Sequence, residues 1–199
     1  MVARESAQSP EEIEKTIAPI LIAGGVGVIP TDTLYGLVGS ALKKETVERI
    51  YELRKRDLKK PMIILISSID DLKSFGVSLN VSQKKVLKKI WPGKVSVVLP
   101  CDERKLQYLH RGEKTLAFRF PADENILSLI ELVGPLVAPS ANLAGEKAAE
   151  TYNQAKKYFD EKIDFYVDSG KLSSQPSTLL TLGNKGEISV LREGAVKII

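Results

Sequence analysis

The spacing of apolar residues along the chain switches between a helical period and the alternating or continuous pattern of strands. After a first helix near the N-terminus, helices are predicted over residues 44–53, 81–91, 121–134 and 149–159. Strands are predicted over residues 26–30, 62–67, 95–100, 115–121, 135–142, 164–170, 177–183 and 187–195. Strands interspersed with helices, without repeats or a low-complexity linker, predict one α/β domain over residues 1–199 around a mixed sheet.

The first helix is predicted from a start of the capping-box kind at Ser9-Pro10-Glu11-Glu12. Apolar residues then recur at helical spacing, at Ile13, Ile17, Ile20 and Leu21. Pro19 lies inside this pattern and predicts either a kink or an early end of the helix, because proline removes a backbone hydrogen bond.

Composition narrows the class of protein. A hydrophobic content of 43% in 199 residues supports one ordinary core, and a net charge of +4 with charges of both signs favours a mixed surface over a dedicated polycation. The single cysteine, Cys101, excludes an internal disulfide and suits a reducing compartment. The N-terminus is too polar for a secretory signal, and no apolar run approaches the ~20 residues of a membrane span. A cytoplasmic location is predicted.

Familiar catalytic and nucleotide motifs are missing. The "GGVG" segment precedes a strand instead of following one, so it cannot form a Rossmann turn, and no Walker motif occurs. His110 is the only histidine and lies in the polar segment "YLHRGEK", where a solvated surface position is expected. No metal site built from protein side chains is identified. The chemistry is therefore expected to depend on hydroxyls, amides, carboxylates and cations.

These polar groups gather where the predicted strands begin or end. The clusters are Thr31, Asp32, Thr33 and Tyr35; Arg54, Lys55, Arg56, Lys59 and Lys60; Arg119; Ser140 and Asn142; and Ser177 and Thr178. In open α/β sheets, ligands bind beyond strand ends, where several connections converge. A pocket of cations and small hydroxyls suits a polyanion that is joined to a small polar molecule.

Each cluster also has a local interpretation. "TDT" can be a turn whose side chains satisfy nearby backbone, "PSAN" a helix cap, and "RKRDLKK" a solvated helix end. The coincidence of several such clusters favours one shared site over separate local roles.

The stretches "PTDTLYGL", "WPGKVSVVLP", "LAFRFP", "APSANLAG" and "LREGA", in this order, closely resemble the YrdC/TsaC family of threonylcarbamoyl-AMP synthases. The resemblance runs from about residue 10 to 195. It implies a twisted mixed sheet with flanking helices around a deep basic cleft. It also implies a reaction of L-threonine, bicarbonate and ATP, with Mg²⁺, that gives threonylcarbamoyl-adenylate and pyrophosphate. The product is handed to a tRNA threonylcarbamoyl transferase complex, for a modification next to the anticodon.

The same resemblance implies roles for individual residues. By motif, threonine is bound by Thr33, Tyr35, Arg119 and Ser140. ATP is bound by Arg54, Arg56, Lys60, Thr115, Asn142, Ser177 and Arg192, of which the cations Arg54, Arg56 and Lys60 stabilise charge on the phosphates. No residue is identified as a general acid or base.

This sequence departs from the family pattern at three places. Arg54-Lys55-Arg56-Asp57 replaces Lys-x-Arg-Pro, Pro176 replaces a glutamate before Ser177-Thr178, and Glu193 replaces a proline after Arg192. The last two features resemble YciO-type paralogues. Two alternatives therefore stay open: a YciO-like or carbamoyl-AMP-forming enzyme that does not use threonine, and a non-catalytic protein that binds double-stranded RNA or tRNA through the lysines of "KKVLKKIWPGK".

The basic cluster raises a question of register. Val47, Ile50 and Tyr51 mark the buried side of the preceding helix, and continued helix brings Arg54 onto that side. An unpaired charge on that side is costly, so the helix either ends by about residue 53 or delivers Arg54 into the cleft. In both cases we expect Arg54, and not Lys55, to take the place of the family's lysine and to face the phosphates.

Overall fold

The computed structural model describes residues 10–198, with side chains from residue 15 onward. Its α-helices are α1 (Pro10–Ile22), α2 (Lys44–Arg54), α3 (Val81–Ile90), α4 (Gln107–His110), α5 (Glu124–Val133) and α6 (Tyr152–Phe159). Its strands are β1 (Gly27–Ile29), β2 (Gly36–Ser40), β3 (Ile63–Leu65), β4 (Val95–Pro100), β5 (Thr115–Arg119), β6 (Leu136–Val137), β7 (Phe165–Tyr166), β8 (Thr178–Leu182) and β9 (Ile188–Arg192). Three short 3-10 helices lie at Ile69–Phe75, Arg104–Leu106 and Asp160–Lys162.

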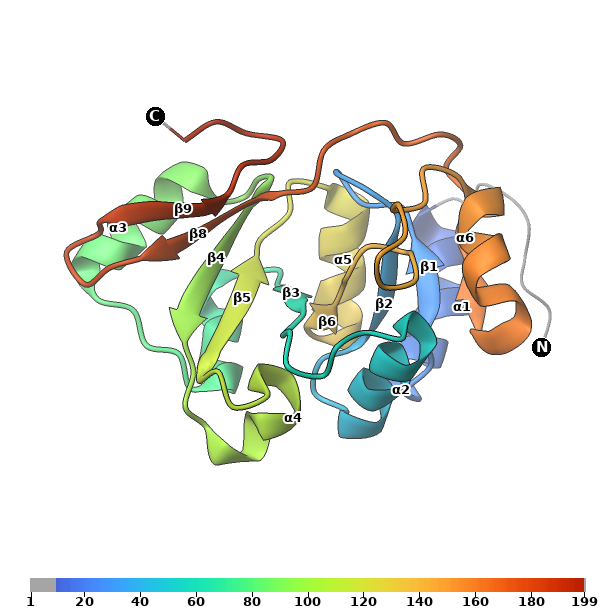
Figure 1. The fold of residues 1–199 in the computed structure, drawn as a ribbon, viewed down its shortest axis with the longest axis horizontal. Coiled ribbons are helices and arrows are strands. Elements are labelled where there is room, and N and C mark those ends of the chain that lie inside the picture. Colours follow the sequence, from blue (N-terminus) through green and yellow to red (C-terminus); the bar gives the residue numbers. More distant parts are fainter. Residues whose placement is uncertain (1–9, 199) are drawn as a thin grey trace.

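The strands form one mixed sheet in the order β7-β1-β2-β6-β3-β5-β4-β8-β9. β3 pairs with β5, β4 with β8 and β1 with β7 in parallel, whereas the other neighbouring pairs are antiparallel. The chain crosses between the two halves of the sheet several times. A long connection leads from β7 over the top of the molecule in Figure 1 to β8 at the other end. The α/β class and the mixed sheet predicted from the sequence are confirmed.

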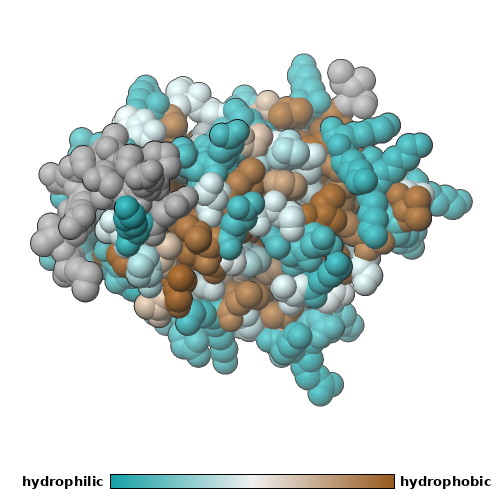
Figure 2. All heavy atoms as spheres, turned by 180° about the vertical axis from the view of Figure 1, so that it is seen from behind, coloured by the Kyte–Doolittle hydropathy of each residue, from teal (hydrophilic) through white to brown (hydrophobic). Residues whose placement is uncertain are grey.

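Two groups of buried apolar side chains hold the layers together. One group, which includes Leu21, Leu65 and Ile130, joins helices α1 and α5 to the sheet. The larger group includes Tyr51, Ile64 and Phe118 and gathers the other helices against it. On the face turned away in Figure 1, hydrophilic side chains project around the rim and apolar residues lie between them in small groups (Figure 2).

Side-chain caps explain why α5 and α6 begin three residues later than predicted, and one also marks the predicted start of α3. Asp123 accepts from the Ile126 amide at the start of α5, and Thr151 accepts from the Gln154 amide at the start of α6. At α3, Asn80 and Gln83 form a reciprocal capping box. These caps satisfy backbone donors that have no partner within the helix.

The structure corrects the sequence reading at three places. Helix α1 continues past Pro19 to Ile22, so the early end is wrong, while the predicted cap at Ser9 lies outside the described residues. Strand β2 was not predicted. All five of its residues are buried, so no alternation marks it, and α2 packs so closely that a side chain at Gly39 would meet Ile50 at 3.1 Å.

His110 is not a solvated surface residue: it is 4% exposed at the end of α4. Its Nδ1 accepts from the Gly112 amide at 3.1 Å, and its Nε2 lies 3.3 Å from the Glu103 carbonyl oxygen. This pattern fits a ring that accepts at Nδ1 and donates through Nε2 to that carbonyl. The histidine therefore closes a loop, and it is not among the residues that line the cavity described below.

Candidate active site

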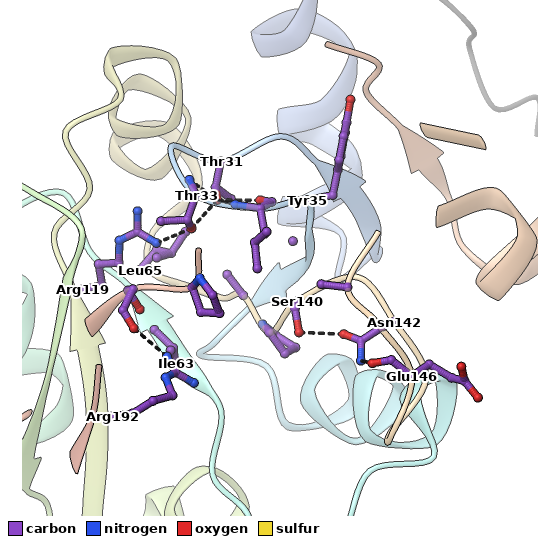
Figure 3. A pocket seen from close by; sticks show the side chains of 17 residues that line it. Thr31, Thr33, Tyr35, Ile63, Leu65, Arg119, Ser140, Asn142, Glu146 and Arg192 are labelled. Carbon is purple, nitrogen blue, oxygen red and sulfur yellow. Dashed lines mark hydrogen bonds between the residues drawn. The ribbon is translucent and has the colours of Figure 1, made fainter. Parts of the chain in front are cut away.

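A cavity of about 190 Å³ lies against the sheet where the turn before β2, the loop after β6, the end of β5 and the entry to β8 meet. Ile63 and Leu65 lie two residues apart on β3, so their side chains share one face and contribute to its lining. Seven predicted site residues line the cavity: Thr33, Tyr35, Arg119, Ser140, Asn142, Ser177 and Arg192. Figure 3 shows how side chains from separate strands and loops surround this space.

The two threonine hydroxyls in the turn between β1 and β2 have different partners. Thr31 donates to the Leu34 carbonyl oxygen at 2.6 Å and accepts from the Leu34 amide at 3.1 Å, so its side chain closes the turn. The local interpretation of "TDT" is therefore confirmed for Thr31. Thr33 is 5% exposed and its hydroxyl instead meets the guanidinium of Arg119.

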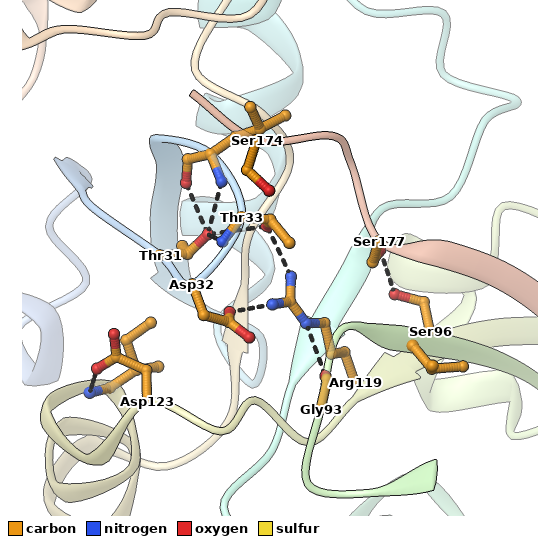
Figure 4. A network of polar contacts seen from close by, with 12 residues as sticks. Thr31, Asp32, Thr33, Gly93, Ser96, Arg119, Asp123, Ser174 and Ser177 are labelled. Carbon is orange, nitrogen blue, oxygen red and sulfur yellow. Dashed lines mark hydrogen bonds and ion pairs between the residues drawn. The ribbon is translucent and has the colours of Figure 1, made fainter. Parts of the chain in front are cut away.

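Arg119, the last residue of β5, is fixed by three contacts (Figure 4). Its Nη1 donates to Thr33 Oγ1 at 2.9 Å, its Nε donates to the Gly93 carbonyl oxygen at 3.3 Å, and its Nη2 pairs with Asp32 Oδ1. Burial lowers the pKa of Arg119, and the neighbouring Asp32 carboxylate opposes that shift. The result is a preorganised cation whose charge is balanced within the protein.

Asp32 was named in the sequence cluster but received no role. Its Oδ2 atom is buried and has no hydrogen-bond partner among the described residues. The structure thus identifies it as the counter-ion that holds Arg119, and the unpaired oxygen leaves capacity for a further donor.

The loop after β6 supplies the opposite wall. Ser140 Oγ donates to Asn142 Oδ1 at 2.6 Å, and Asn142 Nδ2 donates to the carbonyl oxygens of Leu143 and Glu146 at 2.8 and 2.9 Å. An isolated bridge between Gly36 and Ser140 ties this loop to the start of β2. "PSAN" is therefore a self-bonded loop, and the cap predicted as its local role is not what the structure shows.

Arg54 lies behind this wall and does not line the cavity. It is 3% exposed; its Nε donates to the Asn142 carbonyl oxygen at 3.0 Å, and its Nη2 donates to Asn142 Oδ1 at 2.9 Å and to Ser140 Oγ at 3.3 Å. Helix α2 includes Arg54 and does not end before it, and Arg54 bonds to the wall of the cavity instead of lining it, so the prediction that it points into the cleft is wrong. Burial lowers its pKa to about 10, so it is charged at neutral pH.

Three other predicted ATP contacts are not brought to the cavity lining. Arg56 turns back on its own loop, where Nε donates to the Lys60 carbonyl oxygen at 3.0 Å and Nη2 to the Pro61 carbonyl oxygen at 3.1 Å. Lys60 itself is exposed. Thr115 is the first residue of β5, at the opposite end of the strand from Arg119. The geometry gives no support to a contact from Thr115.

Tyr35 is among the residues that line the cavity, but its ring points away from it (Figure 3). Its hydroxyl donates to the Gly170 carbonyl oxygen at 2.8 Å and accepts from the Ser169 amide at 2.9 Å. Burial raises the pKa of Tyr35. Its hydroxyl is thus bonded to the connection before β8, and the contact of Tyr35 with threonine stays a prediction.

Glu146 carries the carboxylate among the cavity-lining residues, whereas two lining residues, Arg119 and Arg192, are cations. Across residues 15–198, whose side chains the structure describes, no group of three or more His, Cys, Asp or Glu side chains could hold a metal ion. Over the same described stretch, none of the helices is both long and apolar enough to cross a membrane.

Comparison with known proteins follows the same motifs. A family model described as "Telomere recombination", the Sua5/YciO/YrdC domain, matches residues 19–194. The chain is 35% identical over 149 residues to threonylcarbamoyl-AMP synthase from Pyrococcus abyssi, a match that covers 74% of this chain and 44% of the relative. The chain thus spans less than half the length of that curated relative.

Two solved structures show the same fold. P. abyssi Sua5, in a crystal structure with L-threonine, matches with a TM-score of 0.85 and 32% identity over 96% of this chain and 56% of that chain. Escherichia coli YciO matches with a TM-score of 0.82 over 95% of this chain and 92% of that chain, but at 24% identity this likeness shows the fold alone. Because the family model covers most of the sequence, the chain belongs to the Sua5/YciO/YrdC family.

Proposed function

We propose that this protein is a threonylcarbamoyl-AMP synthase, which converts L-threonine, bicarbonate and ATP to threonylcarbamoyl-adenylate and pyrophosphate. The observation that carries the proposal is the buried pair of Thr33 and Arg119, joined at 2.9 Å beside the cavity, in a chain 32% identical to a Sua5 crystallised with L-threonine. A fixed hydroxyl next to a fixed cation suits a small hydroxylated amino acid.

The donors and acceptors of Thr33 favour this use. Its oxygen accepts from Arg119, so its proton can be donated either to Thr31, 3.1 Å away, or to a ligand. Thr31 Oγ1 already accepts from two backbone amides, which leaves it a poor acceptor for a third bond. A buried hydroxyl that needs a partner discriminates strongly against a substrate that cannot supply one.

The size of the cavity indicates which substrate it can hold. Its volume of about 190 Å³ is below the ~300–1,000 Å³ that drug-sized ligands occupy, so it suits an amino acid better than a whole nucleotide. In this proposal threonine lies near Thr33, Arg119 and Ser140, and ATP extends past Asn142, Ser177 and Arg192. Arg56 and Lys60 stabilise charge on the phosphates, which requires the exposed loop that carries them to turn toward the nucleotide.

The chemistry requires no strong general base. The amine of threonine and bicarbonate form a carbamate with loss of water, and an oxygen of this anion attacks the α-phosphorus while pyrophosphate leaves. Such a displacement depends mainly on positioning and on cations that absorb charge. A site lined by hydroxyls, an amide and arginines meets these needs without histidine. Magnesium accompanies ATP and would neutralise its phosphates; Glu146 is the lining carboxylate available to it or to its bound water.

The proposal places the protein in the cytoplasm, where ATP and tRNA are available, and hands its product to a tRNA threonylcarbamoyl transferase complex. RNA binding by this chain itself is not favoured. Lys84, Lys85, Lys88 and Lys89 are exposed on α3, but Trp91, the aromatic residue of that segment, is 5% exposed and donates to the Val95 carbonyl oxygen. Its ring is not available to stack on bases.

Pyrophosphate release from ATP, measured with and without threonine and with and without bicarbonate, tests the proposal. We expect release that requires both. Release that continues when threonine is omitted would identify a YciO-like or carbamoyl-AMP-forming enzyme instead. ATP-independent RNA binding that falls steeply with salt, together with no pyrophosphate release, would identify a nucleic-acid-binding protein.

A further inference from the structure

The part of the cavity wall formed by Ser177 and Arg192 is built by a crossing of two chain segments. Ser177 precedes β8 and Arg192 ends β9, and both line the cavity. Arg192 Nη2 donates to the Ser177 carbonyl oxygen at 2.7 Å. The position of each residue therefore depends on how the segment after β9 lies against the entry to β8.

Gly194 sets the distance of this crossing. A side chain at this position would place its Cβ 2.6 Å from the Ser177 carbonyl carbon and 2.7 Å from the Thr178 nitrogen. Both are backbone atoms, which cannot rotate out of the way as a side chain can. The two segments can therefore lie this close only with glycine at position 194. The glycine of "LREGA" thus has a steric reason that its sequence context does not reveal.

Hydrogen bonds secure the crossing on both sides of Gly194. The Ala195 amide donates to the Pro176 carbonyl oxygen at 2.9 Å. Thr178 Oγ1 donates to the Val196 carbonyl oxygen at 2.5 Å and accepts from the Val196 amide at 3.3 Å. Residues 193–196 therefore act as a clasp over residues 176–178; we call them the C-terminal clasp.

A second contact fixes the Ser177 side chain from below. Ser96 on β4 is 0% exposed, and its hydroxyl oxygen lies 2.8 Å from that of Ser177, which is 3% exposed (Figure 4). A buried hydroxyl needs a partner, so this pair holds Ser177 in one rotamer. Ser96 stands in the otherwise apolar run "VSVVLP", a polar interruption of a buried strand.

We propose that Ser96 and Gly194 are positioning residues for the nucleotide: they act through Ser177 and Arg192 and set the affinity for ATP without touching it. This inference rests on the proposed function for the identity of the ligand. Loss of one contact that orients a ligand-binding hydroxyl corresponds to a weakening of about three- to tenfold. Affinity for threonine, which the proposal places at Thr33 and Arg119, stays within about twofold.

Two variants and two matched controls test the inference. Ser96→Ala removes the buried hydroxyl, and Ser40→Ala does the same at a serine 6% exposed at the far end of β2 from the cavity. Gly194→Ala forces the C-terminal clasp away from residues 176–178. Its control, Gly25→Ala, also creates a backbone clash, because the added Cβ lies 2.9 Å from the Ile20 carbonyl oxygen, but Gly25 lies just before β1 and does not line the cavity. The controls separate loss of stability from loss of position.

The measurements are KM for ATP, KM for threonine and kcat on each folded variant. Ser96→Ala and Gly194→Ala are expected to raise KM for ATP about three- to tenfold with little change in KM for threonine, while both controls leave KM unchanged. Equal shifts in all four proteins, or an unchanged KM for ATP in the first two, would overturn the inference.

A second measurement keeps this test separate from the proposed function. If the wild-type protein releases no pyrophosphate with threonine, the proposed function fails, and the clasp is then tested by calorimetric ATP binding and by amide hydrogen exchange. We expect Gly194→Ala to accelerate exchange in the peptides over residues 176–182 and 193–198 and to weaken ATP binding. Unchanged exchange and unchanged ATP binding would refute the clasp itself.

Discussion

A substitution at Arg54 tests the site most sharply. Arg54 is a buried cation that bonds to Ser140 and Asn142, which line the cavity, although Arg54 itself does not. The substitution Arg54→Lys keeps the charge and restores the residue usual in the family. The guanidinium reaches three acceptors through two nitrogens, at 3.0 Å from Nε and at 2.9 and 3.3 Å from Nη2. A lysine has one nitrogen at the tip of its side chain, so it cannot also reach the acceptor now served by Nε.

The magnitude follows from the bond that is lost. The Asn142 carbonyl oxygen would lose a charge-assisted partner in a buried setting, a cost of about 1.5–3 kcal/mol. Among the side chains of residues 15–198 no carboxylate pairs with Arg54, so the ammonium group of a lysine at this position gains no compensating ion pair. We therefore expect the free energy of unfolding to fall by about 1.5–3 kcal/mol. Because Asn142 and Ser140 line the cavity, kcat/KM should fall on the order of tenfold.

The assay combines denaturant unfolding with steady-state pyrophosphate release, and Lys55→Ala is the neighbouring control. Lys55 is exposed and caps α2 in the left-handed region with φ 50°, and its side chain makes no hydrogen bond or ion pair in the described structure. If Arg54→Lys has wild-type stability and alters only the KM for ATP, Arg54 contacts the nucleotide directly and the positioning role is wrong. Wild-type stability together with wild-type activity would refute both roles.

Three further predictions concern Thr33, the basic cluster and the buried tyrosines. Thr33→Val, which removes the hydroxyl that Arg119 meets, should raise KM for threonine at least tenfold and leave ATP binding nearly unchanged; equal loss of both would show that Thr33 supports the fold. Arg56→Ala should cost about 2–4 kcal/mol of transition-state stabilisation while Lys55→Ala stays within a few-fold of wild type, and the reverse order in steady-state pyrophosphate release would shift the basic cluster by one residue. Burial raises the pKa of Tyr35, Tyr51, Tyr108 and Tyr166, so the stability that depends on their protonated forms is complete below the ordinary tyrosine pKa near 10 and is lost as pH rises through the folded values. Absorbance at ~295 nm should therefore report their ionisation together with alkaline unfolding, and full ionisation of a still-folded protein near pH ~10 would contradict this.

Most elements of the fold were predictable because apolar spacing and short-range signals agree along the chain. The exceptions have local reasons. Strand β2 is a buried strand with two glycines and no alternation, so neither period identifies it. His110 looks solvated among polar neighbours, yet the local path of the chain brings its two ring nitrogens to the Gly112 amide and the Glu103 carbonyl oxygen, which apolar spacing does not reveal.

The sequence predicted which residues lie near one another at the site, but not what each of them contacts. Motif clusters at strand ends identified Thr33, Arg119, Ser140 and Ser177 as neighbours, because strands of one sheet bring their connections together. Sequence could not show that Arg54 bonds to the loop that forms the cavity wall, since that depends on the loop after β6 folding back over α2. It also gave no role to Asp32, whose partner Arg119 lies 87 residues away along the chain.

The identity of the product tests the central claim most directly. The protein is incubated with ATP, L-threonine and ¹³C-bicarbonate, and the nucleotide products are identified by mass spectrometry. The account predicts an adenylate that carries both threonine and the labelled carbon, together with pyrophosphate. Formation of ADP and phosphate, or of an adenylate without threonine, would contradict it.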